Sequence, residues 1–436
     1  MSAHVFGTVF AVALATSVTV RLWLAMRQVA FVRAHRETVP ASFAARVGIS
    51  AHRKAADYTV AKQRLSMLHI AVDAALLAAM TLGGGLAAIV AWTEAFDVGP
   101  LWRDVAMFAA AGIVYGAVNL PFSWWHTFRV EERFGFNRMT LALWVSDLAK
   151  GIAVAVALGL PLLVLVLWLM RAAGPAWWLW TWAAWMAFQL LVLVLYPTVI
   201  APLFNKFTVM EDSPARARIE SLLARCGFRS AGLFVMDGSK RSGHGNAYFT
   251  GFGKAKRIVF FDTLLLRLNP DEIEAVLAHE LGHFKLRHVM KRIAWSAVLS
   301  LAILAVLAWL AQAPWFYEGL GIPASMLPVA LARPGVALEL FLLALPVFTF
   351  MLEPLSSHYS RRHEFEADAF ATRMASPAAL TAALVKLYED NAATLTPDPL
   401  HSAFYDSHPP AAQRIARIEA HAPPGRPPGQ SMPLAA

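Results

Sequence analysis

The sequence has few charged residues and almost no cysteine. Only 15% of its 436 residues are Asp, Glu, Lys or Arg, whereas a soluble chain carries about 25%. Because a soluble domain covers its surface with charge, this deficit argues against one and indicates a chain in contact with lipid. The single cysteine, Cys226, excludes an intramolecular disulfide framework and a thiolate zinc cluster.

Long apolar blocks take the place of the missing charge, and 58% of the residues are hydrophobic. A bilayer core about 30 Å thick is crossed by about 20 apolar residues of helix. Seven blocks meet this requirement, so the expected fold is mainly α: a polytopic membrane protein with seven transmembrane helices. The first block has no basic segment before it and no evident cleavage site, so a membrane helix is expected there rather than a signal peptide. Gly83, Gly84 and Gly85 in the second block are attributed to close helix packing. The blocks are 4–26, 66–92, 104–125, 148–170, 177–200, 293–313 and 335–356.

The net charge of +9 follows the expected membrane topology. With seven spans, the basic loop 27–65 and most other charged residues fall on one side of the bilayer, whereas loops 93–103 and 314–333 carry little positive charge. This positive-inside distribution predicts an outside N-terminus and a cytoplasmic C-terminus. Because the lipid bilayer explains the basic residues, no nucleic-acid partner is expected.

The apolar blocks divide the chain into five regions. An N-terminal membrane region contains five spans, and a small soluble α+β insertion separates it from the last two spans. The insertion is predicted to hold a helix at 214–226, a strand at 232–236 and a hairpin of 246–251 with 257–261, turning at 253–256. The tail is rich in Pro and Gly and is expected to be disordered, because it cannot bury a core. The regions are 1–200, 201–292, 293–356, 357–420 and the tail 421–436.

A His-Glu-x-x-His pattern lies on a predicted helix with a well-marked start. Asn269 is the expected N-cap, and the glutamate of a capping box follows three residues later. His279 and His283 are four residues apart, so their imidazoles share one helix face and can bind one ion. Glu280 projects about 100° away, beside the ion, where it can act as a general base. The alternative interpretation is a surface helix with two uninvolved histidines.

A third protein ligand is needed for a zinc site that keeps one position open. The pattern lacks a His-x-x-Gly-x-x-His extension, so a carboxylate further along the chain is expected. Glu364 and Asp368 share a helix face, and one can bind zinc while the other accepts the second N–H of a ligating histidine. The alternative is a solvated charged helix, and this interpretation is adopted for Arg361, Arg362 and Glu366.

The two expected ligand helices lie on the same side of the membrane, because two spans separate them. If the first helix runs straight into the sixth span, His279 lies about 21 Å from Ile293 along the axis, and Glu364 lies about 12 Å past the seventh span. These distances place the zinc near or just inside the cytoplasmic face. His288 is nine residues from His279, off the ligand face, and is assigned to the membrane interface.

Further motifs along the chain carry a resemblance to a known family. With the seven spans and the two ligand segments, the chain resembles the type I CAAX prenyl proteases, which are integral-membrane gluzincin metallopeptidases. The resemblance covers nearly the whole chain except the tail. The additional motifs are 53–64, Glu132–Asn137, Tyr196–Phe207, Ser239–Ser242, Asn246–Phe249 and Ser407–Pro410.

The resemblance implies one Zn²⁺ per chain. It assigns the metal to His279, His283 and Glu364, and it assigns the role of catalytic base to Glu280. It also implies that the seven helices enclose a large water-filled chamber, with the zinc site facing into it.

The same resemblance implies four more site residues. Asp368 has a supporting or proton-donating role, and His408 steadies the reacting carbonyl. Asn246, on a strand beside the cleft, and Arg414 are expected to bind substrate. Gln413 departs from the family, which often has an acidic residue there, so a salt bridge from that position is not expected.

The expected activity is zinc-dependent hydrolysis of peptide bonds in membrane-associated or C-terminally prenylated substrates. A composition rich in Ala and poor in Lys favours a bacterial inner membrane, with the site facing the cytoplasm. Because bacteria generally lack protein prenylation, membrane-protein quality control without a prenyl requirement stays open. A seven-helix transporter or receptor with structural zinc is the remaining alternative, and Asp73 and Glu339 are its candidate intramembrane charges.

Overall fold

The computed structural model describes residues 1–228, 230, 232–250 and 257–420. The turn expected at 253–256 and the tail 421–436 lie outside these residues. Within them, six helical stretches are long and apolar enough to cross a membrane, or seven if the bent pair α2 and α3 forms one span. The mainly α, polytopic fold is therefore confirmed. The membrane helices are α1 (Ala3–Ala34), α2 (Ile49–Met80), α3 (Gly85–Glu94), α4 (Pro100–Trp125), α5 (Leu141–Ala172), α6 (Trp177–Leu195), α11 (His288–Leu310) and α14 (Pro334–Thr349).

The second span is bent rather than straight. Its two helices, α2 and α3, meet at 49°. Gly84 has a φ of 73°, which L-residues rarely adopt. A Cβ on Gly83 would lie 2.8 Å from the carbonyl oxygen of Ala79. The glycines therefore permit a break in the chain, a role that their attribution to close helix packing did not include.

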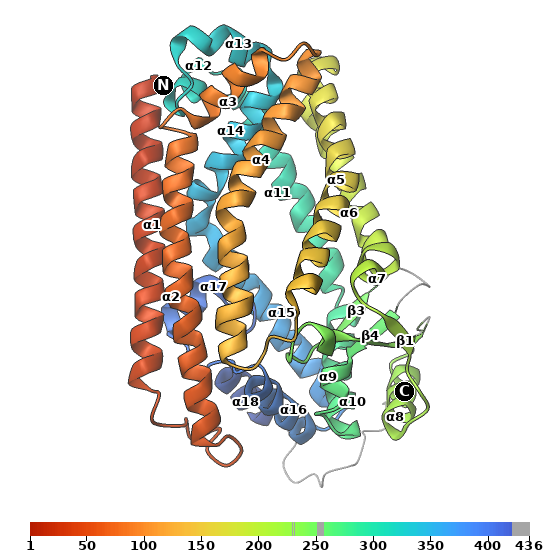
Figure 1. Ribbon diagram of the computed structural model, residues 1–436. Helices are drawn as coiled ribbons and strands as arrows, with labels where there is room; N and C mark the ends of the chain where they lie inside the picture. Colours follow the sequence, from red (N-terminus) through yellow and green to blue (C-terminus); the bar gives the residue numbers. More distant parts are fainter. Residues whose placement is uncertain (229, 231, 251–256, 421–436) are drawn as a thin grey trace.

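The spans do not pack into a solid bundle. The α11 helix buries only 6% of its most apolar stretch, and the α4 span buries 11%. Both spans are therefore exposed along most of their length, and Figure 1 draws the membrane helices spread apart between α12 and the sheet. Two short helices, α12 (Pro314–Gly319) and α13 (Leu327–Ala332), lie at the end of the molecule far from the sheet. At that end Arg333 donates to the fully buried Asp104 at 2.8 Å.

A four-stranded sheet forms the base of the insertion, in the order β1-β2-β4-β3. The β2 and β4 strands are parallel, and the other two pairings are antiparallel, with Ala247 opposite Phe260 in the β3–β4 pair. The expected hairpin is therefore present, and β3 lies at the edge of the sheet. The strands are β1 (Phe207–Val209), β2 (Leu233–Met236), β3 (Ala247–Thr250) and β4 (Arg257–Phe261).

Helices of the insertion and the C-terminal region pack on this sheet in one apolar core. Its fully buried members include Ile219, Phe260 and Leu281. Both α1 and α2 extend into the basic segment 27–65, so the connection between them covers only 35–48. The helices at this end are α7 (Ala201–Phe204), α8 (Pro214–Arg225), α9 (Asp262–Leu265), α10 (Pro270–Lys285), α15 (Glu353–Met374), α16 (Pro377–Asp390), α17 (Pro399–Tyr405) and α18 (Ala411–Ala420).

Candidate active site

The α10 helix begins at the expected capping box. The Asn269 side chain accepts a hydrogen bond from the Glu272 backbone N–H, and the Glu272 carboxylate accepts one from the Asn269 N–H, both at 2.9 Å. Together these bonds satisfy two of the amide groups that a helix start leaves without partners. The capping box therefore fixes the residue at which α10 begins, and this start determines which way His279 and His283 point.

Close packing of α10 on α15 brings the two ligand segments together. A Cβ built on Gly282 would lie 3.0 Å from the Cα of Ala367 and 3.2 Å from the Cβ of Phe370. Only glycine therefore allows the two helix backbones this approach. The glycine within the His-Glu-x-x-His pattern thus sets the distance between the histidines and the downstream carboxylate.

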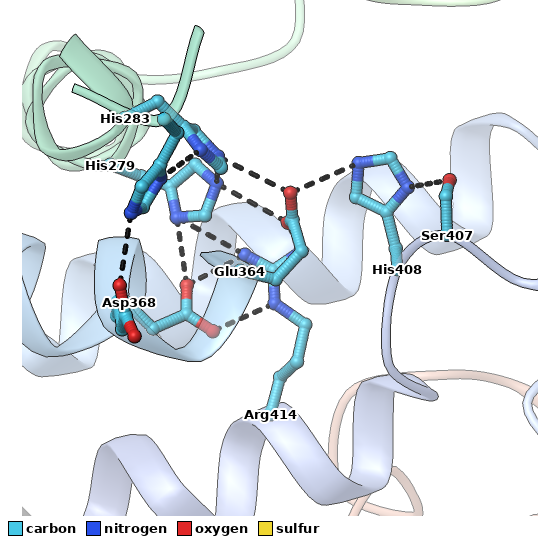
Figure 2. Close-up of polar contacts among 9 residues, drawn as sticks. His279, His283, Glu364, Asp368, Ser407, His408 and Arg414 are labelled. Atoms are coloured by element: carbon cyan, nitrogen blue, oxygen red, sulfur yellow. Dashed lines mark hydrogen bonds and ion pairs between the residues drawn. The ribbon is translucent and has the colours of Figure 1, made fainter. Parts of the chain in front are cut away.

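His279, His283 and Glu364 converge on one point (Figure 2). Their ligand atoms lie within 4.8 Å of one another, and the two Nε2 atoms are 3.2 Å apart. Glu364 Oε1 is 3.2 Å from Nε2 of His283, and Oε2 is 3.5 Å from Nε2 of His279. Oε2 is buried and has no hydrogen-bond partner among the described residues. Such an atom is costly without a partner, so this donor set fits a divalent metal ion.

Asp368 and Arg414 support the first histidine from behind. The Nδ1 atom of His279 is 2.9 Å from Asp368 Oδ1, and Arg414 donates to both oxygens of that carboxylate at 2.8 and 2.6 Å. Burial opposes protonation of His279, but the nearby carboxylates of Asp368 and Glu364 outweigh this effect and raise its pKa to about 9. Binding a metal through Nε2 requires the neutral ring, so metal binding here releases a proton.

His408 lies on the other side of Glu364 from the two histidines (Figure 2). Its Nε2 is 3.6 Å from Glu364 Oε1, and its Nδ1 is 3.0 Å from the Ser407 hydroxyl. Its side chain is 63% exposed, so it can meet a ligand from solution. The Tyr388 hydroxyl donates to the Pro409 carbonyl oxygen at 3.4 Å and holds the loop that carries His408.

A cavity of about 420 Å³ opens beside the ligand set. Glu280 and Asn246 line it, as expected, together with His408 and Arg414. Arg414 is only 5% exposed; its Nε and Nη2 groups donate to Asp368, and its Nη1 lies 3.6 Å from Glu364 Oε2. The rest of the wall is largely apolar and includes Leu264, Val276, Leu380, Leu384 and Leu387.

The loop before β3 is held by residues that the sequence did not single out. Asn391 accepts a hydrogen bond from the Gly245 N–H at 3.1 Å, and His244 Nδ1 is 3.2 Å from the same oxygen. His244 Nε2 is 3.3 Å from Glu131, to which Tyr58 also donates. Asn391 and Glu131 are more than a hundred positions away from His244 in the chain, and Tyr58 is 73 positions from Glu131, so no local pattern marks these residues.

Three assignments made outside the ligand set were wrong. His288 is not turned away from the ligand face: it is 2% exposed, and its Nδ1 is 2.9 Å from that of His283. Glu366 is not simply solvated, because its Oε2 is 3.0 Å from His288 Nε2. Arg361 donates to the carbonyl oxygens of Ser402, Ala403 and Asp406 and so holds α17. Arg362, which is 74% exposed, is solvated as expected.

The error over His288 has a single cause. The α10 helix ends at Lys285, and Arg287 adopts a left-handed conformation with a φ of 56° before α11 begins. The helix therefore does not run straight into the sixth span, and the axial distance of about 21 Å expected for His279 does not apply. Glu364 does lie on a continuous helical stretch, 334–374, with the last span.

A histidine pair and a downstream glutamate, held on helices joined to membrane spans, define an integral-membrane metallopeptidase. The chain belongs to Peptidase family M48: the profile of that family matches residues 211–422. A second profile, described as "CAAX prenyl protease N-terminal, five membrane helices", matches residues 28–206.

Known relatives agree with this assignment. The chain is 37% identical to the CAAX prenyl protease 1 homolog of Arabidopsis thaliana, over 69% of this chain and 70% of that protein. It is 37% identical to CAAX prenyl protease 1 of Saccharomyces cerevisiae, over 69% of each chain. The crystal structure of S. mikatae Ste24p superposes with a TM-score of 0.87 at 28% identity, covering 95% of this chain and 99% of that one. The chain is therefore a multi-pass membrane metalloendopeptidase that uses a metal ion and acts on protein or peptide substrates, and not a transporter or receptor.

Proposed function

We propose that this protein is a zinc endopeptidase whose metal is held by His279, His283 and Glu364. The observation that carries the proposal is the convergence of these three ligand atoms within 4.8 Å, with a buried Glu364 oxygen that lacks a hydrogen bond. Two imidazole nitrogens and one carboxylate are a ligand set of catalytic zinc, and they leave one position for reactants.

Glu280 is the general base in this proposal. When bound, zinc lowers the pKa of a coordinated water to about 7 and polarises the substrate carbonyl. Glu280 follows His279 on α10 and lines the cavity, so its carboxylate can take a proton from the attacking water. The same carboxylate then returns that proton to the leaving amine nitrogen as the peptide bond breaks.

His408 is the donor to the developing oxyanion. With the Ser407 hydroxyl donating to Nδ1, the imidazole carries its proton on Nε2, the atom nearer to the ligand set. A donor placed where negative charge develops stabilises the transition state. Asp368 and Arg414 act behind the histidine pair, where they orient His279 and make no contact with the reacting bond.

The substrate lies extended along β3 in this proposal. That strand pairs with β4 and is the edge strand of the sheet, so its outer backbone groups can pair with a peptide. Asn246, exposed at the start of the strand, lines the cavity and can fix the peptide where it passes the metal. The apolar wall formed by α10 and α16 then receives an aliphatic side chain.

We further propose that the substrates include C-terminally prenylated proteins and that the site faces the cytoplasm of a bacterial cell. The names of the relatives support the substrate class. The basic segments on the side of the site support the orientation, and the composition supports the bacterial inner membrane. Quality-control proteolysis without a prenyl requirement is the second candidate, favoured by the same composition.

The test pairs metal analysis with cleavage of matched peptides, farnesylated and not, by the detergent-purified protein. We expect one zinc ion per chain and faster cleavage of the farnesylated peptide. Glu280→Gln should keep the zinc and lose cleavage by about 10²-fold or more, whereas Glu389→Gln, an exposed carboxylate of α16, should change neither. Normal cleavage by Glu280→Gln would contradict the assignment of the base. Equal cleavage of both peptides would favour quality control.

A further inference from the structure

A second histidine lies directly behind the metal-ligand set. His283 Nδ1 is 2.9 Å from His288 Nδ1, and His288 Nε2 is 3.0 Å from Glu366 Oε2. His288 is 2% exposed, so water does not compete for these contacts. The three side chains therefore form one continuous chain of hydrogen bonds that ends on a ring nitrogen of a metal ligand.

The protonation of these three hydrogen-bonded side chains follows from the requirement that His283 bind the metal. The Nε2 atom of His283 faces Glu364 and His279, so it must present a lone pair for metal binding. The proton of the neutral His283 ring then lies on Nδ1 and is donated to His288 Nδ1. That leaves the His288 proton on Nε2, which donates to Glu366. The two hydrogen bonds thus fix the tautomers of both rings, with the proton on Nδ1 of His283 and on Nε2 of His288.

Neighbouring residues favour this order of hydrogen bonds, from His283 through His288 to Glu366. Arg362 donates to Glu366 Oε1 at 3.1 Å, which leaves Oε2 for His288. The His288 ring stacks on that of His363, with centroids 4.0 Å apart and planes 9° apart. His288 reaches His283 only because Arg287 adopts a φ of 56°, a conformation that costs free energy for a residue with a side chain.

We propose that His288 and Glu366 are positioning residues that fix the tautomer and ring orientation of His283. The inference rests on the proposed zinc ligands and goes beyond them. A carboxylate or other acceptor behind a ligating histidine raises its basicity and orients its ring. Asp368 has that place behind His279, and the His288–Glu366 pair has it behind His283.

A second metal ion bound by His288, His363 and Glu366 would use the same side chains, since their ligand atoms also lie within 4.8 Å of one another. The ring geometry disfavours it. A ring nitrogen binds a metal in the plane of the ring, and two nearly parallel stacked rings cannot share one ion in both planes. The cations Arg362 and Lys291 also approach Glu366.

The test measures zinc affinity of the full-length, detergent-purified protein by competition with a chromogenic chelator. We expect His288→Phe to weaken zinc binding about 10–100-fold, because it keeps the stacked ring but removes both hydrogen bonds. His288→Asn should recover most of the affinity, since its amide oxygen can accept from His283 Nδ1–H. Glu366→Leu should weaken binding, and the control His363→Phe should stay within about twofold of wild type.

Each outcome decides the inference. Unchanged zinc affinity in His288→Phe and Glu366→Leu would overturn it. Two zinc ions per wild-type chain, with one lost in both His288→Phe and His363→Phe, would overturn it in favour of a second metal centre. Equal losses in His288→Phe and His288→Asn, with equally lowered thermal stability of the zinc-free protein, would show a structural role only. If the wild type itself binds no zinc through His279, the proposed function fails as well.

Discussion

Substitution of Gly282 tests how far the metal site depends on the spacing of two helices. An alanine Cβ would lie 3.0 Å from Ala367 Cα and 3.1 Å from its carbonyl oxygen, and neither backbone atom can rotate away. Carbon contacts are favourable at about 3.5–4.0 Å, so α10 and α15 must separate by roughly 0.5 Å. The ligand atoms of His279 and Glu364 lie on these same two helices and separate with them.

The effect on stability and the effect on the metal should differ. Overpacking costs about 1–3 kcal/mol, and alanine is favoured over glycine in a helix by about 1 kcal/mol. Gly282→Ala should therefore lower the free energy of unfolding of the zinc-free protein by about 0–2 kcal/mol. A shift of about 0.5 Å is a quarter of a Zn–N bond of about 2.0–2.1 Å, so zinc affinity should fall about tenfold, or about 1.4 kcal/mol. Gly282→Val should lose more stability and more zinc affinity than Gly282→Ala.

The assay is chelator competition for zinc affinity beside thermal unfolding of the zinc-free protein in detergent. Gly116→Ala is the matched control, because a Cβ on this glycine of α4 would meet nothing within 4 Å. It should keep the zinc affinity of the wild type and show no loss of stability. Wild-type zinc affinity in both Gly282→Ala and Gly282→Val would refute the argument that helix spacing sets the ligand geometry.

Three further predictions concern the supports of the site. Asp368→Asn removes the carboxylate that accepts two hydrogen bonds from the buried Arg414 guanidinium and leaves it only the longer contact with Glu364. The free energy of unfolding should therefore fall by about 3–5 kcal/mol, and a loss below about 1 kcal/mol in chemical denaturation would contradict this. Burial opposes ionisation of Asp398, but Arg27 outweighs it and holds the pKa of that carboxyl below its usual range. The stabilisation from Asp398 should therefore be complete above about pH 4 and be lost as the pH falls further. The difference in thermal unfolding between Asp398→Asn and wild type should thus be full at pH 6 and shrink as the pH is lowered below about 4. Arg287→Gly should raise the free energy of unfolding by up to about 1 kcal/mol with zinc affinity unchanged, because glycine adopts a φ of 56° freely; a drop in stability would show that the Arg287 side chain matters more than its backbone.

Local and periodic features of the structure could be predicted from the sequence. The apolar blocks, the capping box at Asn269 and the shared face of His279 and His283 each depend on residues within one or two helical turns. The even number of spans between His283 and Glu364 placed both ligand segments at one end, and the structure has them there. All of these predictions depend on the regular spacing of residues along helices.

What could not be predicted depends on breaks in that regularity and on distant partners. Neither glycine nor proline marks the helix break at Arg287, so a helical projection placed His288 on the wrong face. Glu366 and Arg361 looked like ordinary surface charges, because His288 and Ser402, which they contact, are separated from them by 41 residues or more in the chain. Such pairings become visible only once the chain is folded.

The helix that carries Glu364 forms a long rod with the last membrane span. The helical stretch 334–374 contains 41 residues, or about 60 Å at 1.5 Å per residue, so about half its length projects beyond a hydrocarbon core of about 30 Å. A change in bilayer thickness that tilts this rod moves the carboxylate at its outer part. The histidine pair is separated from the sixth span by the break at Arg287, whereas its own helix packs on this rod through Gly282. The two halves of the ligand set can thus move together with the last span, and the break at Arg287 isolates them from movements of the sixth span.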